Sequence, residues 1–105
     1  MAQVLWTERA GNDLKEIADY VAQHAPARAA RLVDRLIAAV EPLHSSPRLG
    51  RVVPDFGEDH IREIVSVRPY RILYTIRDDD CYITHVFHSR RNLTDWVRRT
   101  DFDDV

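Results

Sequence analysis

The stretch between Ile61 and Arg91 constrains the fold most, because it holds three consecutive runs of β-type residues joined by very short connections. We expect these runs to be strands over about 61–67, 70–77 and 81–88. Pro69 and the run Asp78–Asp80 occupy the two joints, and neither joint has room for a crossover helix. The three strands are therefore predicted to pair antiparallel.

Side chains on the middle predicted strand alternate between two faces. One face carries Tyr70, Ile72, Tyr74 and Ile76, and the other carries Arg71, Leu73, Thr75 and Arg77. The first face is apolar enough to receive helices, whereas the second is mixed and is expected to meet solvent or a ligand. Arginine recurs along the stretch, at Arg62, Arg68, Arg71, Arg77, Arg90 and Arg91. A guanidinium group suits phosphate or carboxylate, so the sheet is predicted to be a binding surface as well as a core wall.

Two amphipathic helices are predicted before this sheet. Val4–Trp6 is a short strand candidate, and Thr7 is placed to cap a helix that runs from Glu8 to His24. Its acidic residues Glu8, Asp13, Glu16 and Asp19 lie toward the outer face. A second helix begins at Pro26, and Pro42 should kink or end it. The short joint predicts an antiparallel hairpin whose apolar stripes bury against the sheet.

A loop and a C-terminal extension complete the chain. Residues 48–59 contain glycine and proline and are expected to be a loop, whereas Leu93 to Val97 predicts a short helix. The fold class is therefore α+β, with an N-terminal strand, a two-helix antiparallel hairpin on a small, mainly antiparallel sheet, and a short C-terminal helix. We expect residues 1–97 to form a single domain and residues 98–105 to form an acidic, mobile tail.

Charge and cysteine content limit the environment of the chain. The 15 basic and 17 acidic residues leave a net charge of −2, which gives no global attraction to nucleic acid. Lys15 is the only lysine, and the excess of arginine also fits a GC-rich genome. A lone cysteine, Cys81, favours a reducing compartment and a packed side chain. No apolar run approaches the ~20 residues of a membrane span, so a cytoplasmic protein without membrane contact is expected.

Several short motifs, taken together, resemble the RelE/ParE superfamily, the toxins of bacterial type II toxin–antitoxin modules. A P-x-x-G-R loop is formed by Pro47, Gly50 and Arg51. The pattern R-E-x-x-x-x-x-x-Y-R-I-x-Y follows in Arg62, Glu63, Tyr70, Arg71, Ile72 and Tyr74. The last strand ends in Val86, His88, Arg90 and Arg91. The resemblance covers residues 3 to 97, with the elements in the order that this superfamily has.

The resemblance implies one of two toxic activities. RelE-like members cleave mRNA on the ribosome with basic residues, whereas ParE-like members bind and poison DNA gyrase without a recognised catalytic centre. Both kinds bind a cognate antitoxin in a hetero-oligomer, and such modules act in growth inhibition and plasmid stabilisation. Ile64 stands where the ribonucleases commonly carry another basic group, and the ending V-F-H-S-R-R-N-L looks ParE-like. We therefore favour a gyrase inhibitor that is not an enzyme, with an inert relative that only binds antitoxin as a third alternative.

The candidate site residues differ between these alternatives. A metal-independent ribonuclease would use Arg62, Arg71, His88 and Arg91, the arginines for phosphorane charge and the histidine as acid or base. Otherwise Arg62 and Arg71 pair with Glu63, Asp55 or carboxylates of the antitoxin. The expected partner-binding residues are Arg51, Arg62, Arg71, Arg90, Arg91 and Trp96. His85 and His88 fall on opposite strand faces, so neither a metal site nor a cofactor is expected.

Overall fold

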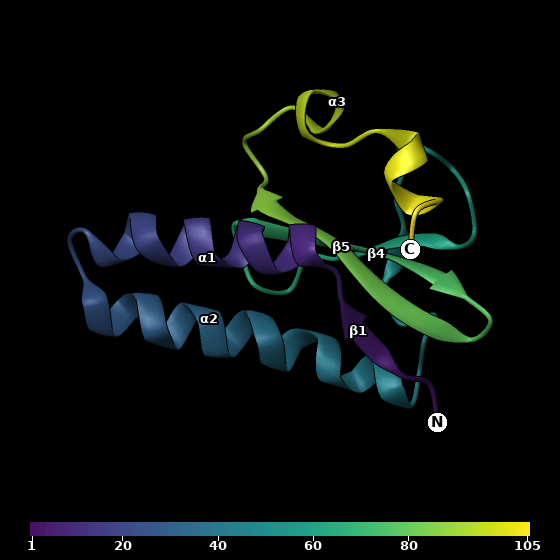
Figure 1. The fold of residues 1–105 in the computed structure, drawn as a ribbon, viewed down its shortest axis with the longest axis horizontal. Coiled ribbons are helices and arrows are strands. Elements are labelled where there is room, and N and C mark those ends of the chain that lie inside the picture. Colours follow the sequence, from purple (N-terminus) through teal and green to yellow (C-terminus); the bar gives the residue numbers. More distant parts are fainter.

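The structure, a computed structural model that describes residues 1–105, places two long helices against one face of a five-stranded sheet (Figure 1). The strands are β1 (Val4–Trp6), β2 (Arg51–Val52), β3 (Ile61–Ile64), β4 (Tyr70–Arg77) and β5 (Asp80–His88). The α-helices are α1 (Glu8–Ala22), α2 (Pro26–Val40) and α3 (Leu93–Trp96). The predicted α+β class and the order of its elements are confirmed.

The sheet has the strand order β1-β5-β4-β3-β2. The predicted antiparallel pairing of β3, β4 and β5 is confirmed, whereas β1 pairs with β5 in parallel. The segment expected to be a loop contains β2, which pairs with β3 through Arg51↔Glu63 and Val52↔Arg62. The sequence did not reveal β2 because two residues cannot show a period of two. Strand β3 ends at Ile64, three residues before the predicted end.

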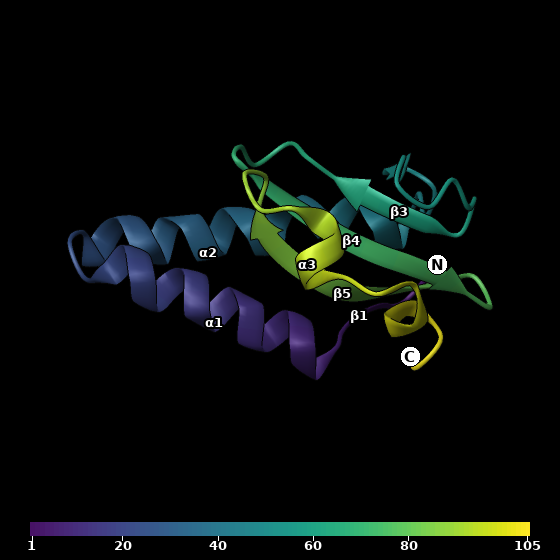
Figure 2. The same ribbon diagram turned by 90° about the horizontal axis from the view of Figure 1, so that it is seen from above.

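The helical hairpin begins where local chemistry predicts, whereas α1 ends at Ala22, two residues before its predicted end at His24. The Thr7 hydroxyl accepts a hydrogen bond from the Ala10 N–H and so caps α1. Pro26 occupies the first turn of α2, which ends at Val40 before a 3₁₀ turn, η1 (Glu41–His44). The end of the hairpin that joins α1 to α2 projects beyond the sheet (Figure 2). None of the helices is both long and apolar enough to cross a bilayer.

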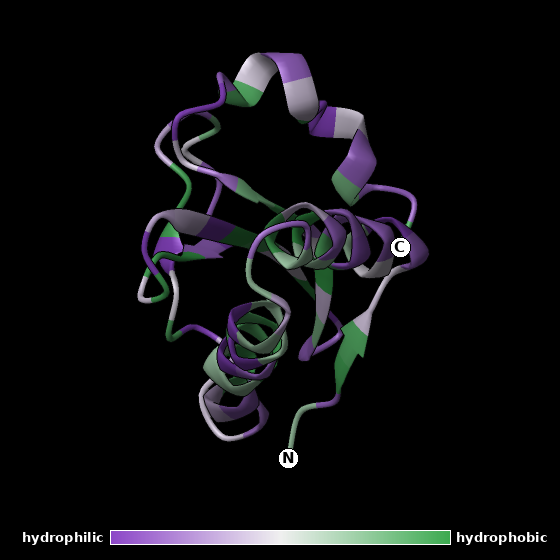
Figure 3. Cartoon of the chain, turned by 90° about the vertical axis from the view of Figure 1, so that its left-hand side faces the viewer, coloured by the Kyte–Doolittle hydropathy of each residue, from purple (hydrophilic) through white to green (hydrophobic).

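A β-bulge sets which side chains of β5 face the helices. The register passes from Leu73↔His85 to Tyr74↔Ile83, so Thr84 is an extra residue on β5. Ile83 and Val86, an odd spacing apart, consequently both enter the core between the sheet and the hairpin. Hydrophobic residues of both layers gather in this space (Figure 3).

The opposite face of the sheet is covered by the C-terminal segment, whereas the alternation along β4 predicted a face that meets solvent or a ligand. Its apolar cluster contains Val53, Ile61, Leu73, Phe87, Leu93, Val97 and Phe102. Residues 98–105, expected to be a mobile tail, include the 3₁₀ turn η2 (Arg99–Phe102), and Phe102 in that turn is only 2% exposed. The apolar side chains on this face of β4 therefore have packing partners in the C-terminal segment.

Candidate functional site

Glu63 is the centre of the arginine cluster on the covered face of the sheet. Its side chain is completely buried, and its two oxygens accept hydrogen bonds from Arg51 Nε and Arg71 Nε, each at 2.7 Å. Arg71 also lies 3.6 Å from Asp55, and its guanidinium stands 5.3 Å from the centre of the Phe87 ring. Two of the predicted basic site residues are thus held by an internal carboxylate.

Arg62 is bound to the preceding loop. Its guanidinium donates to the carbonyl oxygens of Arg48 and Gly50, and to both the backbone and the side chain of Asp59, at 2.7–3.0 Å. Hydrogen bonds from Arg48 and Arg62 lower the pKa of Asp59 below its ordinary value. The Arg62 side chain is only 14% exposed. Arg62 therefore fastens the 48–59 segment to β3.

The four residues of the ribonuclease alternative do not share one surface. Arg62 lies opposite Tyr74 in the register and Arg71 lies opposite Phe87, so the two arginines project from opposite faces. His88 lies opposite Tyr70, on the helix side, with the two ring centres 5.6 Å apart. Tyr74 and Tyr70 are four residues apart on β4, which corresponds to about 13 Å. The sheet separates Arg71 from His88, and the strand length separates His88 from Arg62.

Arg91, the fourth of these residues, follows the end of β5. Its guanidinium lies 4.1 Å from the centre of the Trp96 ring, in a cation–π contact. Arg90 is exposed, and its N–H donates to His88 Nδ1 at 3.0 Å. No group of three or more His, Cys, Asp or Glu side chains with the spacing of a metal site occurs in the structure.

A cleft of about 720 Å³ lies between α1, the end of β5 and α3. It exists because β1 pairs with β5 only over Cys81–Ile83, so that α1 rather than a strand flanks the rest of β5. One wall is a face of α1 with Tyr20, which is 73% exposed, and the other contains Trp96, which is 46% exposed. Arg90 and Arg91 also line the cleft. Two exposed aromatic rings on facing walls are typical of an interaction surface.

Asp13 belongs to this cleft, although its place in the helical pattern predicted a position toward the outer face of α1. Its carboxylate accepts a hydrogen bond from the Val86 N–H at 3.0 Å. This bond gives a partner to a backbone N–H on the edge of β5 that extends beyond β1. Burial raises the pKa of Asp13, against the opposing effect of this bond. The pattern of α1 alone did not show this role, because the partner lies 73 positions away.

The predicted partner-binding residues therefore divide into three places. Arg90, Arg91 and Trp96 lie in the cleft. Arg51 and Arg71 surround Glu63 on the covered face, and Arg62 holds the 48–59 segment. Only the first of these groups has exposed side chains without an internal carboxylate partner.

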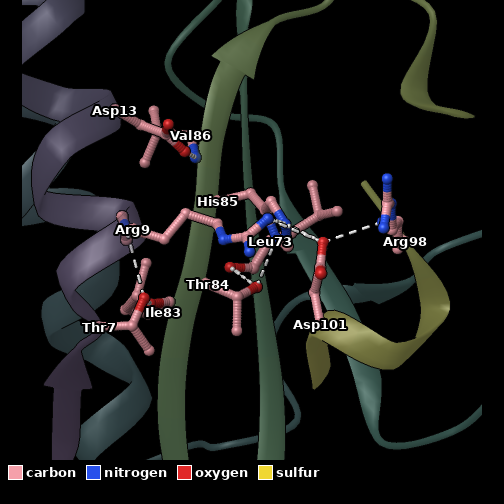
Figure 4. A network of polar contacts seen from close by, with 11 residues as sticks. Thr7, Arg9, Asp13, Leu73, Ile83, Thr84, His85, Val86, Arg98 and Asp101 are labelled. Carbon is pink, nitrogen blue, oxygen red and sulfur yellow. Dashed lines mark hydrogen bonds and ion pairs between the residues drawn. The ribbon is translucent and has the colours of Figure 1, made fainter. Parts of the chain in front are cut away.

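At one end of the cleft, Asp101 receives three donors on a single oxygen (Figure 4). Its Oδ2 accepts from Arg9 Nη1 at 2.9 Å, from His85 Nε2 at 3.0 Å and from the Arg98 N–H at 2.9 Å. On the other side of its ring, His85 Nδ1 lies 2.8 Å from the hydroxyl of Thr84, the bulge residue. A proton on Nε2 is what the carboxylate favours, whereas the Thr84 hydroxyl, which donates to the Leu73 carbonyl, favours a proton on Nδ1.

Burial and hydrogen bonding act in opposite directions on the protonation of this cluster. Burial lowers the pKa of His85, while the hydrogen bond to Asp101 acts in the opposite direction. Burial alone raises the pKa of Asp101, but the Arg98 N–H, His85 and the Arg9 charge together lower it below the ordinary value. Thr84 is 2% exposed, so its hydroxyl is not accessible as a nucleophile despite its bond to His85. Thr84, His85 and Asp101 therefore form a largely buried polar network, which reaches the cleft through Arg9 and His85.

Comparison with known proteins agrees with the fold. The sequence model of the family described as "ParE toxin of type II toxin-antitoxin system, parDE" matches residues 4–93. A curated relative from Caulobacter vibrioides named "Toxin RelE2" is 40% identical over 91 residues, covering 87% of this chain and 99% of the relative. A solved structure titled "Chromosomal ParDE TA system from P. aeruginosa" superposes with a TM-score of 0.72 at 22% identity. That match covers 84% of this chain and 96% of the other.

Proposed function

Because this chain belongs to the ParE toxin family of type II toxin–antitoxin systems, we propose that it inhibits bacterial growth by binding DNA gyrase directly. Family membership makes the chain the toxin component of such a module, with a cognate antitoxin as its partner. The proposal places the toxin in the cytoplasm, in a hetero-oligomer with that antitoxin until it is released.

The separation of Arg62, Arg71 and His88 is the observation that carries this proposal. Metal-free RNA cleavage needs a base, an acid and a cation around one phosphate. Here Arg71 and His88 project from opposite faces of the sheet, and Arg62 is bound to the 48–59 segment. Inhibition by binding has no such requirement, because it depends on the shape and charge of a surface.

The cleft supplies a surface of that kind. Trp96, Arg91 and Arg90 combine an exposed aromatic ring with two cations, the residue types that dominate binding energy at protein interfaces. A guanidinium group stacked on Trp96 still presents its N–H edge to a carboxylate. We therefore assign this wall of the cleft to target contact.

Ribosome-dependent mRNA cleavage is the second candidate, and the observation that favours it is the name of the relative "Toxin RelE2". In that case binding to the ribosome would have to bring the separated arginines to one RNA segment. An inert relative that binds only antitoxin is the third alternative, and it would cause no growth arrest.

The test is tightly induced expression of the chain alone in a bacterium, with DNA damage signalling and bulk mRNA decay followed in parallel. We expect DNA breaks and filamentation with intact messages, and inhibition of supercoiling by purified gyrase. Trp96→Ala and Arg91→Ala should each weaken inhibition by about tenfold or more. Arg35→Ala, at an exposed position on α2, is the matched control and should leave inhibition unchanged.

Rapid cleavage of messages without DNA damage would instead establish the ribonuclease. Arg71→Met should then abolish killing in a protein that remains folded. Absence of any growth arrest from well-expressed, folded protein would support the inert relative.

A further inference from the structure

The three donors on Asp101 Oδ2 join parts of the chain that are far apart in sequence. Arg9 belongs to α1, His85 to β5, and the Arg98 N–H to the C-terminal segment itself. In Figure 4 the Arg9 side chain reaches across β5 toward Asp101. Asp101 also lies beyond residues 4–93, the part of the chain that the family model matches.

We propose that Asp101 is a positioning residue, which clamps the C-terminal segment to α1 and thereby fixes Trp96 in the wall of the cleft. The assignment of the cleft to target contact rests on the proposed function, but the clamp itself does not. Arg9 and His85 both line the cleft and both bind Asp101, so the clamp lies at the boundary of that surface. It spans the two walls from which Tyr20 and Trp96 are presented.

Helix α3 needs such support because it contains only four residues, Leu93–Trp96. A single turn of helix is unstable by itself, so tertiary contacts on either side must hold it. The Asn92 side chain caps its beginning. After its end, Val97 is buried, and the chain is then extended at Arg98 up to the clamp. The position of Trp96 therefore depends on anchors that precede it, at Asn92 and Leu93, and on anchors that follow it, at Val97 and the clamp.

The clamp has an apolar companion in Phe102. This ring lies 5.4 Å from the His85 ring and 5.6 Å from the Phe56 ring, in the second apolar cluster. Apolar packing is not directional, so Phe102 supports burial of the segment without fixing its register. Three hydrogen bonds to one carboxylate oxygen are directional, and two of them come from charged or ring donors. Asp101 thus supplies the geometric precision that packing alone lacks.

The loss of Asp101 also removes the one carboxylate that Arg9 and His85 share. Arg9 Nη1 lies 3.5 Å from His85 Nε2, and the carboxylate is what both of them donate to. Without the anion, Arg9 keeps only this 3.5 Å contact to the His85 ring, which is a hydrogen bond only when Nε2 accepts. Arg9 would then turn to solvent, since its side chain is already 52% exposed. The connection between α1 and the C-terminal segment would be lost with it.

The experiment uses the full chain with Trp6→Phe, so that Trp96 is the only tryptophan. Asp101→Asn is compared with Asp104→Asn, which changes an exposed aspartate of the same segment. We expect Asp101→Asn to increase acrylamide quenching of Trp96 and to speed amide exchange of residues 97–102 by about tenfold or more. Exchange in β3 and β4 should stay unchanged, and so should every property of the control.

Two further variants distinguish loss of the clamp from a general loss of folding. Arg9→Gln removes only the contact from α1 and should increase Trp96 quenching in the same direction. Asp101→Glu keeps the charge and should restore part of the protection. Unchanged quenching and exchange in both Asp101→Asn and Arg9→Gln would overturn the proposal. Quenching that rises only together with exchange throughout the sheet would overturn it as well, because that pattern indicates general destabilisation.

Measuring gyrase inhibition by the same proteins tests the clamp and the proposed target independently. If both are right, Asp101→Asn should weaken inhibition about tenfold while Asp104→Asn inhibits like the parent chain. If Trp96 is released but inhibition by the variant and the parent is equal, the clamp stands and the cleft is not the surface that contacts gyrase.

Discussion

Replacing Glu63 with Gln should show that the arginines of the covered face are structural. The buried carboxylate accepts two charge-assisted hydrogen bonds, from Arg71 and Arg51. Such a bond contributes about 1.5–3 kcal/mol. The Arg51 side chain is 60% exposed, so its bond is discounted to about 1 kcal/mol or less. An amide can serve only one guanidinium group, because its NH₂ is a donor facing the other.

We therefore expect Glu63→Gln to lower the free energy of unfolding by about 2–4 kcal/mol. For a domain of this size, this corresponds to a fall in Tm on the order of 10–20 °C. Thermal unfolding followed by circular dichroism measures it, with Glu16→Gln at an exposed position as the control. Arg71→Met should be destabilising too, and the double variant should be less unstable than the sum of the single ones.

A Tm within about 2 °C of the parent for Glu63→Gln would refute this reasoning. So would an Arg71→Met protein that keeps its Tm and loses growth inhibition, because Arg71 would then act on a target rather than on Glu63.

Three further predictions test other parts of the fold. Tyr74→Phe should cost about 2–3 kcal/mol in urea unfolding, because the hydroxyl accepts from the Gly50 N–H and donates to the Pro47 carbonyl; an unchanged midpoint would contradict this. Phe102→Ala should cost about 3 kcal/mol or more if the C-terminal segment is part of the core, and nothing if that segment is mobile. Burial lowers the pKa of His85 below 6.5, so the unfolded chain binds the extra proton and stability should fall as pH drops below about 6.5. His85→Gln should flatten that part of the Tm-against-pH profile, and an equal slope in both proteins would contradict the assignment.

Local patterns were sufficient for most elements of the fold. Apolar spacing in α1 and α2, the Thr7 cap, and Pro26 at the start of α2 depend on residues within a few positions of one another. The short joints around β4 left antiparallel pairing as the only choice. Strand β2 and the bulge at Thr84 were missed because both arise from pairing with another strand.

The candidate site was predicted only in part. The recurrence of arginine correctly pointed to carboxylate partners, and the alternative that Arg71 pairs with Glu63 and Asp55 is what the structure contains. The sequence could not show that Arg71 and His88 face away from each other across the sheet, since that depends on the register. It gave no signal for Asp101, whose donor Arg9 is 92 positions away.

The sequence by itself determined the family, the order of the elements and which residue types would meet the sheet, because these follow from short-range periodicity and recognisable motifs. Tertiary structure decided which charged side chains form ion pairs within the fold and which remain exposed in the cleft. Glu63 forms ion pairs with both Arg51 and Arg71 within the fold, whereas Arg90, Arg91 and Trp96 remain in an open cleft. The physical reason is that an ion pair depends on distance in space. Residues that are 8, 12 or 92 positions apart become neighbours only when the sheet and the C-terminal segment have assembled.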